Sequence, residues 1–290
     1  DRKKMSKSVG NVVVPTDLLE QPGADAVRYW AGSARPGTDT AFDAGQMKIG
    51  RRLAIKILNA SKFALGLGDA PAGAPVTEPL DRAMLAALAD LVDDATAAFE
   101  GFDYARALQR TEAFFWSFCD DHLELVKARA YGEDDAATSA RVALRAALST
   151  LLRLFAPFLP YATEEVWSWC GDADGAGRLD GFEADSVHAA SWPTAGPLRA
   201  LAGDSPDTAV LSVAAEVLGR IRKAKSDAKA SMRADVSSVT VTDTAERLAA
   251  LALAADDVRG AGKVAELVAV EGPADGEPSV EVVLAPVADD

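Results

Sequence analysis

The chain has 290 residues, 49% of them hydrophobic, which is enough for one large domain or two to three smaller ones with apolar cores. Its net charge of −14 excludes a protein that is basic throughout. The charge is uneven, however, because residues 1–66 hold 11 Lys and Arg against 6 Asp and Glu, and residues 206–235 hold 6 against 4. Local basic patches can therefore bind a nucleic acid while the acidic remainder repels nonspecific contacts.

Membrane and secretion signals are missing from the sequence. No apolar run approaches the length of a membrane span, and the basic N-terminal residues precede no apolar stretch. Cys119 and Cys170 lie far apart and form no metal-type pair, so they indicate a reducing compartment. We expect a cytoplasmic protein without a membrane partner or a protein-bound metal.

The first feature in chain order is a short basic loop at residues 4–8, Lys-Met-Ser-Lys-Ser, which Gly10 follows. Serine hydroxyls donate hydrogen bonds, glycine allows unusual backbone angles, and lysine is a mobile point charge. Such a loop can bend closely around a chain of phosphates. The alternative is a solvated basic loop, because short motifs also match by accident.

A series of helices follows the loop. Two short helices are expected up to residue 35, where Arg28 and Arg35 either meet phosphates or form salt bridges. Apolar residues at helical spacing then predict longer helices at 45–65, at 84–99 with Gly101 as the stop, and at 103–130, 135–155 and 161–169. Short connections between them predict an antiparallel helical bundle.

The remainder of the chain has a mixed pattern. Residues 171–205 are rich in Gly, Asp and Pro and predict a loop that wraps the bundle, with Trp192 as an anchor. A helix should begin at Ser205-Pro206 and become basic at its end, where Arg222, Lys225 and Lys229 lie three and four residues apart. Strand-like runs from residue 236 onward predict a small α+β domain. The fold class is therefore mainly α, with divisions at 1–44, 45–204 and 205–290.

Several segments resemble one enzyme family. Residues 4–8 are similar to the signature loop of class I aminoacyl-tRNA synthetases, which closes on ATP while the amino acid is adenylated. Residues 23–29 resemble the segment after that loop in the subgroup for branched aliphatic amino acids and methionine. Residues 36–43 and 57–63 resemble the valine-specific members in particular. These matches occur in order and at the spacing of that family.

The bundle carries the same resemblance. Residues 120–127 and 156–167 are similar to segments of the subgroup's anticodon-binding domain. Phe115 and Trp116 would then be placed to stack on anticodon bases, with core packing as the alternative that helical spacing favours. The face of Arg222, Lys225 and Lys229 would contact tRNA phosphates, with a solvated helix face as the alternative.

The resemblance implies roles for particular residues. Lys4 and Lys7 would stabilise charge on the phosphates in the transition state. The ATP-binding set would be Lys4, Met5, Ser6, Lys7 and Ser8, and the tRNA-binding set Arg28, Arg35, Phe115, Trp116, Arg222, Lys225 and Lys229. The implied partners are valine, ATP with Mg²⁺, and tRNA(Val), and no DNA.

The resemblance covers only the C-terminal part of such an enzyme. Neither His122 nor His188 belongs to the His-x-Gly-His motif of the family's nucleotide-binding fold. We therefore expect this chain alone to be inactive in valine-dependent ATP–pyrophosphate exchange. Two alternatives stay open: a piece of an isoleucine-specific synthetase, and a stand-alone tRNA-binding or scaffold protein.

Overall fold

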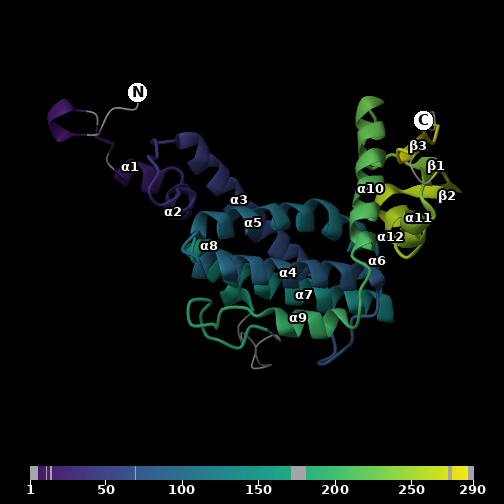
Figure 1. Cartoon of the computed structure of the whole chain (residues 1–290), viewed down its shortest axis with the longest axis horizontal. Coiled ribbons are helices and arrows are strands. Elements are labelled where there is room, and N and C mark those ends of the chain that lie inside the picture. The colour runs from purple at the N-terminus through teal and green to yellow at the C-terminus, as the bar shows by residue number, and fades with distance from the viewer. Residues whose placement is uncertain are drawn as a thin grey trace. The chain divides into compact units, whose positions relative to one another are not determined.

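The computed structural model describes residues 6–10, 12–13, 15–68, 70–170, 181–273 and 276–286. Helices dominate these parts, and strands occur in them only near the C-terminal end (Figure 1). The predicted class, a mainly α protein with a helical bundle and a small α+β region after it, is confirmed.

The chain divides into two compact units. The first comprises Asp1–Gly66, Leu91–Ala113 and Arg145–Thr194, and the second Leu67–Asp90, Phe114–Leu144 and Ala195–Asp290. The first unit contains α1 (Pro15–Glu20), α2 (Ala24–Gly32), α3 (Ala44–Leu65) and α8 (Pro160–Trp169). Both units draw residues from α4 (Pro79–Glu100), α5 (Tyr104–Ser117) and α7 (Asp135–Phe155). The predicted divisions at 44 and 204 stay predictions.

Helix α3 shows how the sequence builds the first unit. The carboxylate of Asp43 accepts hydrogen bonds from the backbone N–H groups of Gly45 at 2.7 Å and Gln46 at 3.3 Å, which is an N-cap. A Cβ added at Gly50 would lie 2.6 Å from the Cβ of Tyr29, so glycine lets α2 and α3 approach closely. One apolar stripe of α3 is buried: Met47, Leu53, Ile57 and Ala60.

A second cap links distant parts of the first unit. The carboxylate of Asp25 in α2 accepts hydrogen bonds from the backbone N–H groups of Tyr161 at 3.1 Å and Ala162 at 2.7 Å, in the first turn of α8. Burial raises the pKa of Asp25, because desolvation outweighs these two donors. The carboxylate thus satisfies N–H groups that have no partner within the helix.

The loop after α8 is fixed by tryptophans, as predicted for Trp192. Its indole N–H donates to the hydroxyl of Thr96 at 2.9 Å, and its ring meets that of Phe99 edge to face at 5.1 Å. The indole N–H of Trp167 donates to the carbonyl oxygen of Ala184 at 2.8 Å. These bonds hold residues 181–194 against the helices of the first unit.

In the second unit, the helix predicted for 103–130 is interrupted. A π-helical turn at Phe118–His122 separates α5 from α6 (Leu123–Ala130). Such turns are often found at functional sites. Neither Gly nor Pro marks this one in the sequence, so periodicity alone could not reveal it.

The C-terminal part of the second unit contains a three-stranded sheet (Figure 1). Its strand order is β2-β1-β3, with β2 parallel and β3 antiparallel to the central β1. The elements are α9 (Ala195–Ala202), α10 (Ala209–Asp227), β1 (Val236–Asp243), α11 (Ala245–Ala252), α12 (Ala255–Gly262), β2 (Val264–Glu271) and β3 (Ser279–Leu284). Helices α9 and α12 were not predicted. Helix α10 begins at Ala209 rather than at Pro206, because Ser205 has a left-handed φ of 47°.

A buried ionic cluster lies in the core of the second unit. The guanidinium of Arg129 on α6 binds the carboxylate of Asp81 with two hydrogen bonds of 2.9 and 3.0 Å. It binds that of Asp257 on α12 with two more, of 2.9 and 3.1 Å. Its Nη1 also donates to the carbonyl oxygen of Ala136 at 2.8 Å, and the hydroxyl of Ser139 donates to Asp81 at 2.7 Å. Arginine is the residue suited to such paired contacts.

Candidate functional site

Part of the predicted phosphate loop lies outside the described residues, namely Lys4 and Met5. The described part forms a 3₁₀ turn at Lys7–Val9, which Gly10 ends with a φ of 72°. The hydroxyl oxygens of Ser6 and Ser8 lie 2.6 Å apart. The side chain of Lys7 is exposed and can meet a ligand, so the ATP-binding role of this loop stays a prediction.

The two arginines predicted to contact tRNA near the start of the chain are both exposed. Arg28 donates to the carbonyl oxygen of Pro157 at 2.8 Å. The side chain of Arg35 is 61% exposed and lies 4.0 Å from the carboxylate of Asp103. Ion pairs this exposed are weak, so Arg35 can exchange its partner for a ligand at little cost.

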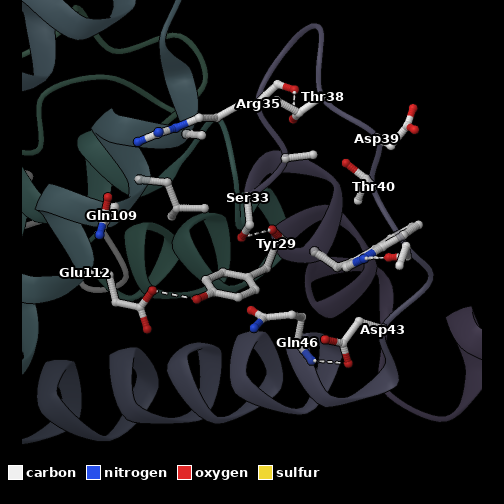
Figure 2. A pocket seen from close by; sticks show the side chains of 15 residues that line it. Tyr29, Ser33, Arg35, Thr38, Asp39, Thr40, Asp43, Gln46, Gln109 and Glu112 are labelled. Carbon is white, nitrogen blue, oxygen red and sulfur yellow. Dashed lines mark hydrogen bonds between the residues drawn. The ribbon is translucent and has the colours of Figure 1, made fainter. Parts of the chain in front are cut away.

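Arg35 also borders a cavity in the first unit with a volume of about 600 Å³ (Figure 2). Its walls come from α2, the loop that follows α2, the start of α3, and α5. Figure 2 shows the carboxylate of Glu112 pointing at the hydroxyl of Tyr29, with Gln46 near the Tyr29 ring. The sequence did not reveal this site, because its residues come from two segments, 29–46 and 105–112, that lie more than 50 positions apart.

The polar groups of this cavity favour ligands that donate hydrogen bonds. The hydroxyl of Tyr29 donates to Glu112 at 2.6 Å, and burial together with that carboxylate raises the pKa of Tyr29. Asp39, Asp43 and Glu112 line the walls together with a single cation, Arg35. Three carboxylates against one guanidinium repel a phosphate and favour a neutral group with N–H or O–H donors.

The predicted aromatic pair differs in accessibility. Phe115 is only 2% exposed and belongs to the core, so it is not available to stack on a base. Trp116 is half-buried, and its ring centroid lies 6.3 Å from that of Phe115. The alternative of core packing is correct for Phe115, since an apolar residue at a core position of an amphipathic helix is buried there.

The predicted basic face of α10 does not form as one exposed surface. Lys225 is 1% exposed, and its ammonium donates to the carbonyl oxygens of Gly262 at 2.8 Å and Met232 at 3.2 Å. Burial lowers the pKa of Lys225. Arg222 donates to the carbonyl oxygen of Asp120 at 2.6 Å. Lys229 is exposed but lies beyond the helix end, with a φ of 55°. The prediction that these three cations share one exposed face was therefore wrong, because helical spacing does not show which side of a helix is buried by other segments.

Two further observations concern the described residues only. They contain no group of three or more His, Cys, Asp or Glu side chains placed to hold a metal ion. None of their helices combines the length and apolar character needed to cross a membrane.

Two protein families match large parts of the chain. Residues 81–241 match the family described as "Anticodon-binding domain of tRNA ligase". Residues 1–43 match "tRNA synthetases class I (I, L, M and V)". The first match alone covers more than half of the chain, and the two do not overlap.

Similar curated proteins are named valine–tRNA ligases. The one from Thermobifida fusca is 58% identical over 290 residues, which is 99% of this chain and 31% of that protein. The one from Salinispora tropica is 56% identical and covers 92% of this chain and 32% of that protein. The chain thus spans about a third of the length of these curated relatives.

A solved structure described as a ternary complex of Agrobacterium radiobacter K84 agnB2 LeuRS, tRNA and LeuAMS is also similar. Its TM-score is 0.46 at 22% identity, covering 68% of this chain and 22% of that one. This likeness is too low to support a functional argument.

Proposed function

The chain belongs to the class I tRNA ligases that carry this anticodon-binding domain, and on that premise we propose that it is the C-terminal, tRNA-holding part of a cytoplasmic valine–tRNA ligase. The observation that carries the proposal is the 56–58% identity to valine–tRNA ligases over 92–99% of the chain. We assign residues 1–44 to the end of the catalytic domain, 45–204 to the anticodon-binding domain and 205–290 to a small C-terminal domain.

The whole enzyme would catalyse two steps. The valine carboxylate attacks the α-phosphorus of ATP, which gives valyl-adenylate and releases pyrophosphate. The terminal ribose hydroxyl of tRNA(Val) then attacks the valyl carbonyl, which gives valyl-tRNA and releases AMP. Mg²⁺ would arrive with the nucleotide.

Within this chain, the loop of residues 4–8 would act on the first step. The ammonium groups of Lys4 and Lys7 would follow the negative charge that moves onto the leaving pyrophosphate. Hydroxyl donors from Ser6 and Ser8 lie on either side of Lys7, and their oxygens are already 2.6 Å apart. A loop that closes on its ligand stabilises the transition state only where its contacts strengthen there.

For tRNA, we retain four exposed or half-exposed candidates: Arg28, Arg35, Trp116 and Lys229. Arg222 stays a weaker candidate, because it is already bonded to the carbonyl oxygen of Asp120. Phe115 and Lys225 are omitted, since both are buried.

Competitive binding tests this proposal against its alternatives. The 290-residue chain should bind labelled tRNA(Val) and release it more readily to unlabelled tRNA(Val) than to tRNA(Ile). Preference for tRNA(Ile) would favour the isoleucine enzyme. Equal competition by every tRNA would favour a scaffold or general tRNA-binding protein.

A further inference from the structure

Helix α3 has an unusual charge for this protein. It contains five basic residues and no acidic residue, in a chain whose net charge is −14. The basic residues are Lys48, Arg51, Arg52, Lys56 and Lys62. The structure shows which of these cations share one side of the helix.

Five residues define what we call the α3 basic face: Lys48, Arg52, Ile55, Asn59 and Lys62. They are spaced four and three residues apart, so they lie along one side of the helix. All five are exposed, including 47% of Ile55, while Leu53 and Ile57 on the other side are buried. From Lys48 to Lys62 the helix rises by 14 residue steps, or about 21 Å at 1.5 Å per residue.

The cations of this face keep their charge as far as the described part of the first unit shows. Among the described residues, no carboxylate lies within ion-pair distance of Lys48, Arg52 or Lys62. The ammonium of Lys62 instead lies 5.7 Å from the ring centroid of Trp169, a cation–π contact that leaves its charge in place. On α10, by contrast, Arg220 pairs with Glu216 and Lys223 pairs with Asp227.

We propose that the α3 basic face binds the phosphate backbone of tRNA. Charge complementarity supports this occupant, because a row of exposed cations attracts phosphates. Two other surfaces are less suited to phosphates: the cavity near Arg35 is acidic, and the basic end of α10 is partly buried and partly paired. A face of about 21 Å spans roughly six phosphates of one strand at the spacing of duplex DNA. The exposed Ile55, midway along the face, can cover the apolar side of a ribose. This inference rests on the proposed tRNA-binding function and names its contact surface.

The test is a salt titration of tRNA binding to the 290-residue chain. The variant Lys48→Gln/Arg52→Gln/Lys62→Gln removes three charges and keeps side chains of similar reach. Fluorescence anisotropy with labelled tRNA(Val) should show a log–log salt slope that is smaller by about two to three units. At 0.1 M salt this corresponds to about a hundredfold weaker binding. A tRNA with another anticodon should lose the same factor, because phosphate contacts carry no sequence information.

A matched control removes three charges elsewhere. Arg110, Lys127 and Arg259 are exposed and lie near Asp94, Glu124 and Asp256, at 3.3, 3.6 and 3.4 Å. The variant Arg110→Gln/Lys127→Gln/Arg259→Gln should keep the wild-type slope and bind within about twofold. An equal loss in both triple variants would overturn the proposal, because net charge alone would explain it.

An unchanged slope in the α3 variant would also overturn it, and would assign this face to contacts with another protein segment. If that variant unfolds, Arg52→Glu alone should still reduce the slope by at least about one unit. Failure of the wild-type chain to prefer tRNA(Val) would refute the proposed function. Wild-type preference with an unaffected α3 variant would refute this inference alone.

Discussion

Replacing Arg129 by Met should destabilise the second unit severely. Arg129 uses all five guanidinium donors, four of them on the carboxylates of Asp81 and Asp257. Its side chain is 13% exposed, while those of Asp81 and Asp257 are 0% and 9% exposed. Methionine can fill the volume but leaves both carboxylates buried without their cation.

The expected cost follows from that geometry. Removing one partner of a buried ion pair typically costs about 3–5 kcal/mol, because an uncompensated charge stays in a poorly solvated site. Two facts place Arg129→Met at the upper end of this range. Two carboxylates lose their partner at once. The hydroxyl of Ser139 still donates a hydrogen bond to one of them, Asp81, and not to Asp257.

Urea denaturation followed by circular dichroism measures this change in the free energy of unfolding. The control is Arg259→Met on α12, whose exposed pair with Asp256 should contribute less than about 1 kcal/mol. Arg129→Lys should fall between the two, because one ammonium cannot bind two carboxylates in paired fashion. A loss below about 1 kcal/mol for Arg129→Met would refute the reasoning.

Three further predictions concern buried groups. Burial, with a smaller effect from Arg129, lowers the pKa of His122 to about 4, although the carboxylate of Asp81 3.7 Å away acts to raise it. The unfolded chain therefore binds the proton first, and the folded state loses stability as pH falls from 6.5 to about 4. Over that range wild type should lose roughly 3 kcal/mol more than His122→Gln, and parallel pH profiles would count against this. Lys225→Met should cost about 1–3 kcal/mol by leaving the buried carbonyl oxygen of Gly262 and the part-buried one of Met232 without this donor. The exposed Lys229→Met should stay within about 0.5 kcal/mol, and equal urea midpoints for the two variants would contradict this. Gly50→Ala should cost about 1–3 kcal/mol through overlap with Tyr29, and Gly196→Ala, which meets no atom within 4 Å, should not destabilise; thermal melting of both decides the comparison.

Local sequence patterns predicted most of the helices, because apolar spacing and caps act within a few residues. Helix α3 begins at Ala44, one residue from the prediction, because Asp43 supplies a strong N-cap. The π-helical turn at Phe118–His122 carries no such signal. Helix α12 was missed because its eight residues include two glycines and two aspartates, which read as a turn.

The candidate site was harder to predict from the sequence than the helices, because it depends more on tertiary contacts. The resemblance identified the family and predicted the phosphate loop, since those matches are local in sequence. Helical spacing grouped Arg222, Lys225 and Lys229, yet the carbonyl oxygens of Met232 and Gly262 that bury Lys225 come from segments 7 and 37 residues away. The cavity between Tyr29 and Glu112 likewise joins helices 83 residues apart. Neither contact follows from periodicity, because both depend on how elements pack.

Binding of tRNA(Val) with an exchanged anticodon tests the central claim most directly. The 290-residue chain is titrated by fluorescence anisotropy with tRNA(Val) and with the same tRNA carrying an unrelated anticodon. A tRNA-holding part that contains the anticodon-binding domain should prefer the native anticodon by about tenfold or more, or about 1.4 kcal/mol. Equal affinity for both tRNAs, or no binding of either, would contradict the account.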